Sequence, residues 1–140
     1  MKRIKYISSF AKEMNPKEIT AMAGQAARNN SENDITGILM AKGGVFFQII
    51  EGPDDHVDSL YNKILQDPRH KKVITLGVQT GDLKRLFPKW HMKTLNLDTM
   101  SSQRLQTMRS IIDAVHKQSE IIDDLTNALS SAAWDELQGM

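Results

Sequence analysis

Apolar and polar residues follow two different periods over residues 2–97 of the chain. Apolar side chains at every second position are typical of strands, and apolar side chains spaced three and four apart are typical of amphipathic helices. The pattern predicts the order β-α-β-β-α-β-β, with strands at 2–8, 35–40, 45–52, 72–80 and 91–97. The first six elements are the split β-α-β arrangement of a ferredoxin-like α+β fold, whose two helices cover one face of an antiparallel sheet.

Turn and cap residues set the ends of the predicted elements. Asn15-Pro16 is typical of a helix start, with Asn as the N-cap and Pro in the first turn. Asn29-Asn30-Ser31 should end this helix. The second helix should be capped by Asp54 or Asp55 and should end at Asp67-Pro68. Lys42-Gly43-Gly44 predicts a hairpin between the second and third strands.

The last 40 residues have a purely helical pattern. Apolar residues keep helical spacing over 105–115 and again over 121–129, which predicts two amphipathic helices or one broken helix. We therefore divide the chain into a domain of residues 1–97 and a helical extension of residues 98–140. The extension should cover the open face of the sheet or mediate assembly, and we expect a homo-oligomer. Trp134 is expected to pack back onto the protein, with a place at an interface as the alternative.

Composition excludes several classes of site and partner. The net charge of +1 gives no electrostatic reason to expect a nucleic acid or a membrane surface as partner. Cysteine is absent, which excludes disulfides, thiolate nucleophiles and zinc–thiolate sites, and the four histidines lack metal-ligand spacing. No apolar run approaches the roughly 20 residues of a membrane span, and no signal peptide is recognisable at the N-terminus. We expect a cytoplasmic protein without a metal.

Gln48 interrupts the apolar strand 45–52. A buried side-chain amide carries two N–H donors and an acceptor, and leaving one unpaired costs roughly 1–3 kcal/mol. Either a neighbouring backbone group or a bound ligand must therefore satisfy it, and the strand alone leaves both readings open. Tyr6 on the first strand should be its neighbour, because these two strands are adjacent at the centre of a split β-α-β sheet.

Further polar residues should gather near Gln48, since they follow the two helices that cover its face: Asn30, Asp67, Arg69 and His70. A phenol, two amides, a guanidinium and an imidazole around one space form the set that a planar, hydrogen-bonding ligand needs.

Six stretches of the chain, in this order, resemble the BLUF family of flavin-based blue-light sensors. They are Tyr6-Ile7-Ser8, Asn29-Asn30-Ser31, Ile35-Thr36-Gly37, Phe47-Gln48-Ile49-Ile50-Glu51-Gly52, Asp67-Pro68-Arg69-His70 and Phe87-Pro88-Lys89-Trp90-His91-Met92. The resemblance covers residues 2–97. It implies a photoreceptor rather than an enzyme, with oxidised FAD or FMN held non-covalently between the two helices.

The resemblance also implies roles for individual residues. Tyr6 would donate an electron and a proton to the excited flavin, and Gln48 would bridge Tyr6 and the flavin. Trp90 and Met92 would form the switchable pair that relays the signal through the last strand to the C-terminal helices, and so to a downstream protein or a second copy. The remaining cofactor-binding residues would be Asn29, Asn30, Lys63, Asp67, Arg69 and His70.

Two functions of other classes also suit the predicted topology. An RNA-binding module would stack bases on Tyr6 and Phe47 of the first and third strands, but the basic residues do not cluster on the sheet. A small acyl-phosphate hydrolase would use Arg28 or Arg69 with Asn30, but it would need a phosphate-cradling glycine loop that the chain lacks.

Overall fold

The computed structural model describes residues 1–138 and contains five strands, three α-helices and one 3₁₀ turn over this range. The elements are β1 (Lys2–Phe10), α1 (Pro16–Glu32), β2 (Thr36–Lys42), β3 (Val45–Gly52), α2 (Asp54–Gln66), β4 (His70–Thr80), β5 (Lys93–Asn96), a 3₁₀ turn (Gln103–Leu105) and α3 (Gln106–Leu137). The predicted order of the first seven elements is confirmed.

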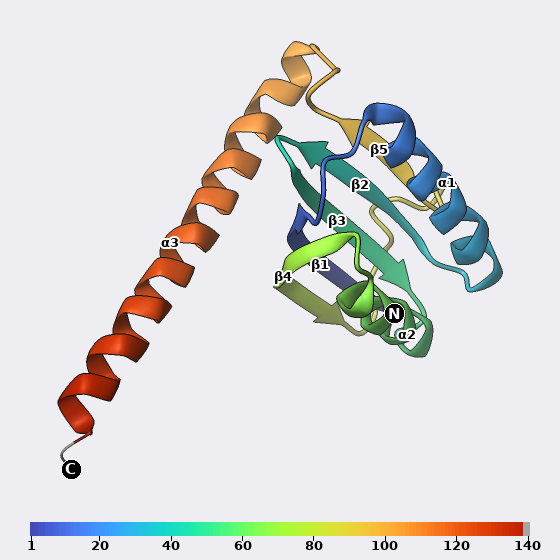
Figure 1. The fold of residues 1–140 in the computed structure, drawn as a ribbon. Coiled ribbons are helices and arrows are strands. Elements are labelled where there is room, and N and C mark those ends of the chain that lie inside the picture. Colours follow the sequence, from blue (N-terminus) through green and yellow to red (C-terminus); the bar gives the residue numbers. More distant parts are fainter. Residues whose placement is uncertain (139–140) are drawn as a thin grey trace.

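The strands form one twisted sheet in the order β4-β1-β3-β2-β5 (Figure 1). β1 pairs antiparallel with both β3 and β4, and β2 pairs antiparallel with β3. β5 pairs parallel with β2, so the sheet is mixed and the expectation of a wholly antiparallel sheet is wrong at this edge. The long connection after β4 causes this difference, because it carries the chain to the opposite edge of the sheet before β5 begins.

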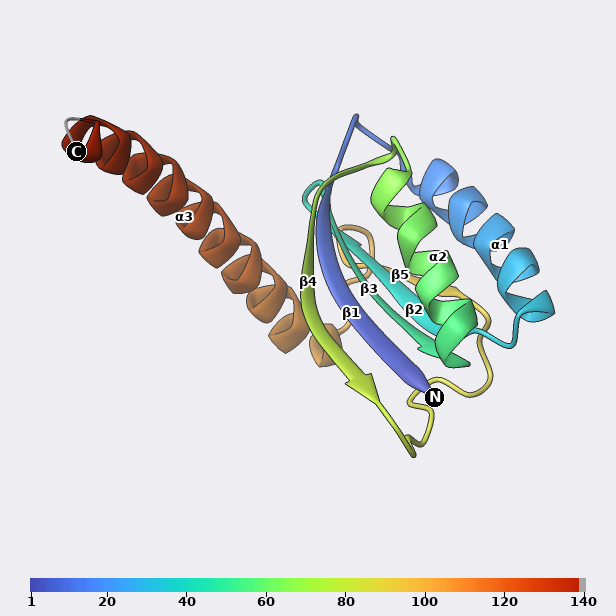
Figure 2. The same ribbon diagram turned by 90° about the horizontal axis from the view of Figure 1, so that it is seen from below.

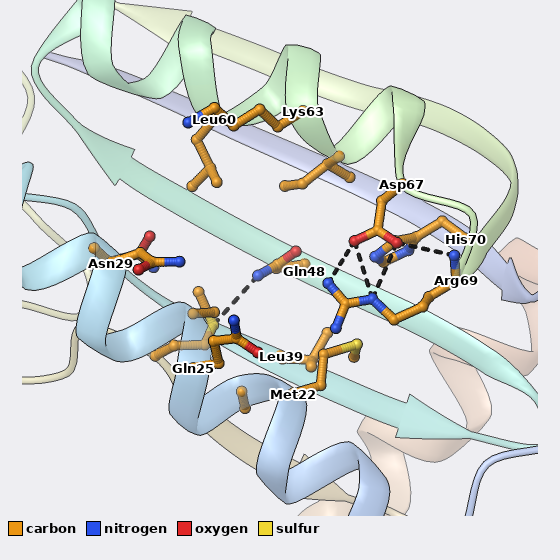
Figure 3. A pocket seen from close by; sticks show the side chains of 15 residues that line it. Met22, Gln25, Asn29, Leu39, Gln48, Leu60, Lys63, Asp67, Arg69 and His70 are labelled. Atoms are coloured by element: carbon orange, nitrogen blue, oxygen red, sulfur yellow. Dashed lines mark hydrogen bonds and ion pairs between the residues drawn. The ribbon is translucent and has the colours of Figure 1, made fainter.

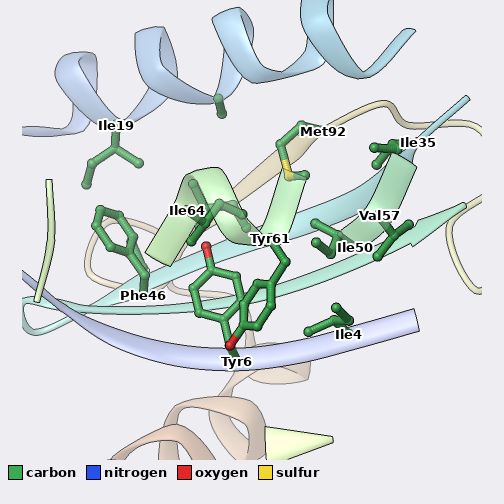
Figure 4. Close-up of a cluster of buried hydrophobic side chains, with 13 residues drawn as sticks. Ile4, Tyr6, Ile19, Ile35, Phe46, Ile50, Val57, Tyr61, Ile64 and Met92 are labelled. Carbon is green, nitrogen blue, oxygen red and sulfur yellow. The ribbon is translucent and has the colours of Figure 1, made fainter. Parts of the chain in front are cut away.

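Two apolar cores lie on opposite faces of the sheet. α1 and α2 cover one face, where Tyr6, Phe46 and Ile50 pack against helix residues such as Ile19 and Val57 (Figures 2 and 4). The beginning of α3 covers part of the other face, which we call the outer face. The second core consists of Ile7, Met40, Val45, Leu97, Leu105 and Ile112. Alternation along the strands thus separates two sets of buried side chains.

The C-terminal extension forms one continuous helix, so the prediction of two helices or a broken one is wrong. α3 starts against the sheet and then projects away from it (Figures 1 and 2). No Gly or Pro interrupts residues 106–137, so nothing in the sequence breaks the helix there. Trp134 lies near the far end with 70% of its surface exposed, so it does not pack back as expected.

Local signals predicted one helix start correctly and missed another. Asn15 caps α1 in a capping box, since its Oδ1 accepts the Glu18 N–H at 2.9 Å and Glu18 accepts the Asn15 N–H. In α2 the N-cap is Pro53 without a side-chain cap, so the predicted cap by an aspartate is wrong. Asp54 instead lies in the first turn, where it pairs with the N-terminal ammonium at 3.0 Å.

Two other boundaries differ from the sequence-based expectation. α1 continues through Asn29-Asn30-Ser31 to Glu32, because Asn30 makes tertiary contacts instead of ending the helix. β5 begins at Lys93, so Trp90 and Met92 precede the last strand. The end of α2 at Asp67 is as predicted.

Candidate functional site

Tyr6 and Gln48 are directly opposed on the two central strands, on the face covered by α1 and α2. The Tyr6 hydroxyl donates a hydrogen bond to Gln48 Oε1. Gln48 Nε2 donates to the Met92 sulfur at 3.3 Å. Only 7% of Gln48 is exposed, so its amide is held from both sides by protein side chains rather than by the backbone.

A cavity of about 200 Å³ lies directly above this amide, between α1 and α2 (Figure 3). Gln48 forms part of its floor, and Met92 lines it as well. The cavity brings together seven of the eight predicted cofactor-binding residues: Asn29, Asn30, Gln48, Lys63, Asp67, Arg69 and His70. Tyr6, the eighth, does not line it and reaches it through Gln48.

An ion pair between Asp67 and Arg69 forms one rim of the cavity. Arg69 Nη2 lies 2.5 Å from Asp67 Oδ2, and Arg69 Nε contacts both carboxylate oxygens. The hydrogen bonds from Arg69 lower the pKa of Asp67, and the same contact raises the pKa of Arg69. Both groups therefore stay charged at neutral pH. Arg69 also borders an adjacent groove of about 630 Å³ along α1.

His70 and Tyr6 are held in their neutral forms by burial. Burial lowers the pKa of His70, whose Nδ1 lies 2.8 Å from the Ser8 hydroxyl. Burial also raises the pKa of Tyr6 well above its usual value, so the phenol keeps its proton. The two rings meet edge to face at 5.9 Å. Two uncharged rings therefore lie side by side next to the Gln48 amide.

Asn30, Asn29 and Lys63 take different positions around the cavity. Asn30 is 2% exposed, and its Nδ2 donates to the His91 carbonyl at 2.7 Å. Asn29 and Lys63 are exposed and lie at the rim, on α1 and α2 respectively.

The predicted pair Trp90 and Met92 is split between the two faces of the sheet. Met92 is buried beside Gln48. Trp90 is 41% exposed, stacks on Phe87 with ring centroids 6.2 Å apart, and lines an apolar groove on the outer face with Ile49 and Met108. The structure therefore brings Met92, and not Trp90, to the cavity.

Two polar residues of the site were missed by the sequence reasoning. Gln25 lines the cavity on α1, and its position four residues before Asn29 on the same helix face was a usable signal. Ser8 contacts His70 and lies two residues after Tyr6, hence on the same strand face.

The geometry does not favour the two alternative functions. Tyr6 is buried beneath the helices, whereas Phe47 packs into the outer-face core, so the two rings form no common stacking surface. Arg28 does not line the cavity that contains Asn30, and Arg69 is paired with Asp67. Within residues 1–138, no cluster of His, Asp or Glu could hold a metal ion, and no helix has the length and apolarity needed to cross a membrane.

The donor set around the cavity fits an isoalloxazine ring. Its walls are apolar, from residues such as Met22, Leu60 and Ile64, which suits the faces of a planar aromatic ring. Amides at Gln25, Asn29, Asn30 and Gln48 provide both donors and acceptors, as the edge of the flavin pyrimidine ring requires.

A family model described as sensors of blue-light using FAD matches residues 1–93. The photoactivated adenylate cyclase subunit beta of Euglena longa is 38% identical over 106 residues, which cover 73% of this chain and 12% of that protein. The blue light- and temperature-regulated antirepressor BluF of Escherichia coli is 36% identical over 99 residues, or 71% of this chain and 23% of that protein. The chain thus spans less than a quarter of the length of these curated relatives.

Solved structures agree with this similarity. A bacterial light-regulated adenylyl cyclase superposes with a TM-score of 0.82 at 35% identity, over 88% of this chain and 36% of that one. BlsA in its photo-activated state superposes with a TM-score of 0.65 at 28% identity, over 76% of this chain and 74% of that one. BlrP1 of Klebsiella pneumoniae with FMN and cyclic diGMP superposes with a TM-score of 0.64 at 31% identity, over 71% of this chain and 27% of that one.

The family description confirms the predicted flavin as cofactor, with FAD as the form it names, and it describes a sensor rather than an enzyme. The ferredoxin-like sheet with two helices on one face is likewise confirmed. The match to residues 1–93 establishes that this chain belongs to the BLUF family of blue-light sensors, and the apolar walls and amides of the cavity above Gln48 suit the flavin of that family.

Proposed function

We propose that this protein is a blue-light receptor in which Tyr6 and Gln48 carry out the primary photochemistry and Met92 receives the result. The observation that carries the proposal is the continuous hydrogen-bonded series from the Tyr6 hydroxyl through the Gln48 amide to the Met92 sulfur, directly beneath the cavity. Residues 1–97 would form the sensing domain, and residues 98–140 would carry the output.

An oxidised flavin bound in the cavity supplies, on absorbing blue light, a strong one-electron oxidant. Tyr6 is the donor, because its phenol is the oxidisable group in contact with the cavity floor. Its proton leaves through Gln48 Oε1, since this oxygen accepts the phenol hydrogen bond. The electron and the proton both return to Tyr6, so the only lasting change is in the amide.

After this transfer, the Gln48 side chain is left either as a rotated amide or as the imidic tautomer. Both forms exchange the positions of its donor and acceptor. Rotation would turn the amide oxygen toward the Met92 sulfur, and tautomerisation would move one of the two nitrogen protons to the oxygen. Either change would alter the 3.3 Å contact with the sulfur. The contact between Gln48 and Met92 is therefore the first point at which the signal leaves the cavity.

The path from Met92 to α3 is short. Met92 directly precedes β5, and Leu97 directly follows it. The Leu97 N–H donates to the Ala41 carbonyl of β2. The Leu97 carbonyl in turn accepts from Arg109 Nε of α3 at 3.2 Å. Leu97 also packs with Leu105 and Ile112 in the outer-face core. A shift of β5 would thus move the start of α3.

The output step of the proposal is self-association through α3. Residues Ile111, Val115, Gln118, Ile122, Leu125 and Leu129, which we call the α3 stripe, follow alternating spacings of four and three, as in a coiled coil. Of these, Ile122, Leu125 and Leu129 are at least 60% exposed.

Charge favours a second copy of this chain as the occupant of the stripe. In a coiled coil the e and g positions lie directly beside the apolar stripe. Between residues 112 and 133 these positions are all uncharged: Ile112, Ala114, Ser119, Ile121, Thr126, Ala128 and Ala133. The acidic residues Glu120, Asp123 and Asp124 lie away from the stripe, so two copies would meet without repulsion between like charges. A downstream protein remains the alternative partner.

Absorption spectroscopy of the purified chain tests the proposal directly. We expect a yellow protein with an oxidised-flavin spectrum that shifts to the red under blue light and recovers in the dark. Acid extraction followed by chromatography would identify the flavin. A folded, colourless preparation that takes up neither FAD nor FMN would contradict it.

A further inference from the structure

Arg3 and Glu51 form a buried ion pair on the outer face, away from the cavity. The two residues are directly paired on β1 and β3, and Arg3 Nε lies 2.9 Å from Glu51 Oε2. Glu51 is completely buried and Arg3 nearly so. A charge in such a place is stable only while its partner and its hydrogen bonds remain.

The pair binds the connection between β4 and β5, which we call the 81–92 connection. Arg3 Nη2 donates to the Lys84 carbonyl at 2.6 Å, and Glu51 Oε1 accepts the Phe87 N–H at 2.7 Å. The third arm of the guanidinium, Nη1, contacts Gln79 near the end of β4 at 3.0 Å. The remaining polar atoms of Arg3 and Glu51 thus bond to this connection or to β4, the strand that leads into it.

The end of the 81–92 connection carries Trp90 and Met92. The Trp90 carbonyl accepts the Gly37 N–H at 2.9 Å, and the Phe87 ring stacks on Trp90. Glu51 thus holds Phe87 and Gly37 holds Trp90, and two residues later Met92 contacts Gln48.

Gly37 lies where no side chain would fit between two strands. A Cβ at this position would collide with the backbone carbonyl of Ile49, so β2 and β3 are in close contact where they receive Trp90. The Arg3–Glu51 pair therefore holds the connection at Lys84 and Phe87. Further along, Arg85 bonds to Thr36, Trp90 to Gly37 and His91 to Asn30.

We propose that Arg3 and Glu51 are positioning residues that hold Trp90 on the outer face and Met92 in the cavity, and that they thereby set the rate at which the lit state returns. Only the effect on the recovery rate rests on the proposed function; the positions of Trp90 and Met92 do not. The pair touches neither the cavity nor Tyr6 or Gln48, so it acts on the photocycle through the connection alone. Weakening it removes part of the stabilisation that draws Met92 back to Gln48 after illumination.

Glu51→Gln is the principal test, because it keeps the shape and one acceptor oxygen but removes the charge that pairs with Arg3. Arg3→Lys is the milder variant, which retains the charge and loses the contacts to Lys84 and Gln79. Asp58→Asn is the matched control, since it weakens the partly exposed Lys2–Asp58 ion pair on the neighbouring residue of β1. All variants are made in full-length flavin-loaded protein with Trp134→Phe, so that Trp90 is the only tryptophan.

We expect Glu51→Gln to bind flavin and to shift to the red by the normal amount, while its dark recovery slows about tenfold, equivalent to about 1.4 kcal/mol in the barrier. Acrylamide quenching of Trp90 fluorescence in the dark should change in the same variant. Arg3→Lys should change the recovery rate and the Trp90 quenching in the same direction, but by less. Asp58→Asn should match the parent protein in both measurements.

Unchanged or faster recovery in folded, flavin-loaded Glu51→Gln overturns the proposal, as does unchanged Trp90 quenching. If Glu51→Gln does not fold, the same two measurements on Arg3→Lys decide. If the parent protein shows no red shift, the proposed photochemistry fails, and the dark Trp90 quenching alone then decides whether the pair holds the connection.

Discussion

Asn30 at the end of α1 donates its side-chain N–H to the carbonyl of His91, the residue directly before Met92. The two residues are 61 positions apart in the sequence, and the bond spans 2.7 Å. Asn30 also lines the cavity, so one amide touches both the flavin site and the segment that leads to β5.

Asn30→Ala should therefore lower both flavin retention and stability. Removing one partner of a buried hydrogen bond costs about 1–3 kcal/mol. Urea unfolding and the flavin-to-protein ratio after gel filtration measure the two effects. Asn33→Ala is the matched control, because Asn33 is exposed and its side chain bonds only to the Asn29 carbonyl at the end of α1. Equal flavin content in the two variants would argue against a cofactor role for Asn30.

The two tyrosines of the site should behave differently. Tyr6→Phe should bind flavin and lose the light-induced red shift, because it removes the hydroxyl that donates to Gln48. Tyr61→Phe should keep the shift, because the Tyr61 hydroxyl contacts Thr75 at 2.5 Å, although its ring lies only 5.5 Å from that of Tyr6. Light-minus-dark absorption spectra of both variants decide the matter.

Gln48→Leu should bind flavin and show no red shift, since leucine has no amide to rearrange. A full-sized shift in this variant, measured by the same difference spectra, would rule out the amide mechanism.

Met92→Leu should alter the dark recovery rate more than Trp90→Leu does. The leucine nearly preserves the volume of methionine, so the stability cost should stay below about 1.5 kcal/mol, but the sulfur that accepts the Gln48 N–H is lost. Trp90 does not line the cavity. Flash-induced absorption recovery compares the two, and a larger effect from Trp90→Leu would indicate that Trp90 enters the site in solution.

His70 should make the protein less stable as the pH falls below neutrality. Burial is the main cause that lowers its folded-state pKa below the ordinary 6.5, while Asp67 raises the pKa and Arg69 lowers it. Below pH 6.5 the unfolded chain therefore takes up a proton at this position that the folded chain refuses, and the free energy of unfolding decreases until the folded pKa is reached.

Urea unfolding of the wild type and His70→Asn between pH 7.5 and 5.5, as a range about the ordinary histidine pKa, measures this effect. The pH dependence should be weaker in His70→Asn. His116→Asn on α3, away from the cavity, is the control, and the same reduction in both variants would refute the assignment to His70.

The α3 stripe should determine the oligomeric state. Leu125→Asp together with Leu129→Asp should give a monomer, because two carboxylates would face each other across the proposed contact. Trp134→Asp near the end of the same helix is the control, since Trp134 lies off the stripe and should leave the dimer intact. Light scattering in the dark and under blue light gives the mass, and a wild-type monomer in both states would exclude self-association.

Periodicity and local capping were enough to predict much of this molecule. The alternation of strand residues predicted the element order and the place of Gln48 beside Tyr6, because a strand buries every second side chain whatever its partner. The capping box at Asn15 was equally predictable, since all of its contacts lie within one turn. The same reasoning, with the family resemblance, named seven residues that line the cavity.

Tertiary contacts decided the rest. Asn30 looked like a helix end, but its partner His91 is far away in the sequence and keeps it inside α1. Nothing in the strand pattern indicates that Arg3 and Glu51 form a buried pair, because the connection that folds over them is far away in the sequence. Likewise, β5 is parallel because of the path that this connection takes, and Met92 rather than Trp90 faces Gln48 for the same reason. Periodicity reports which side chains share a face, whereas long-range pairing depends on how distant segments are brought together.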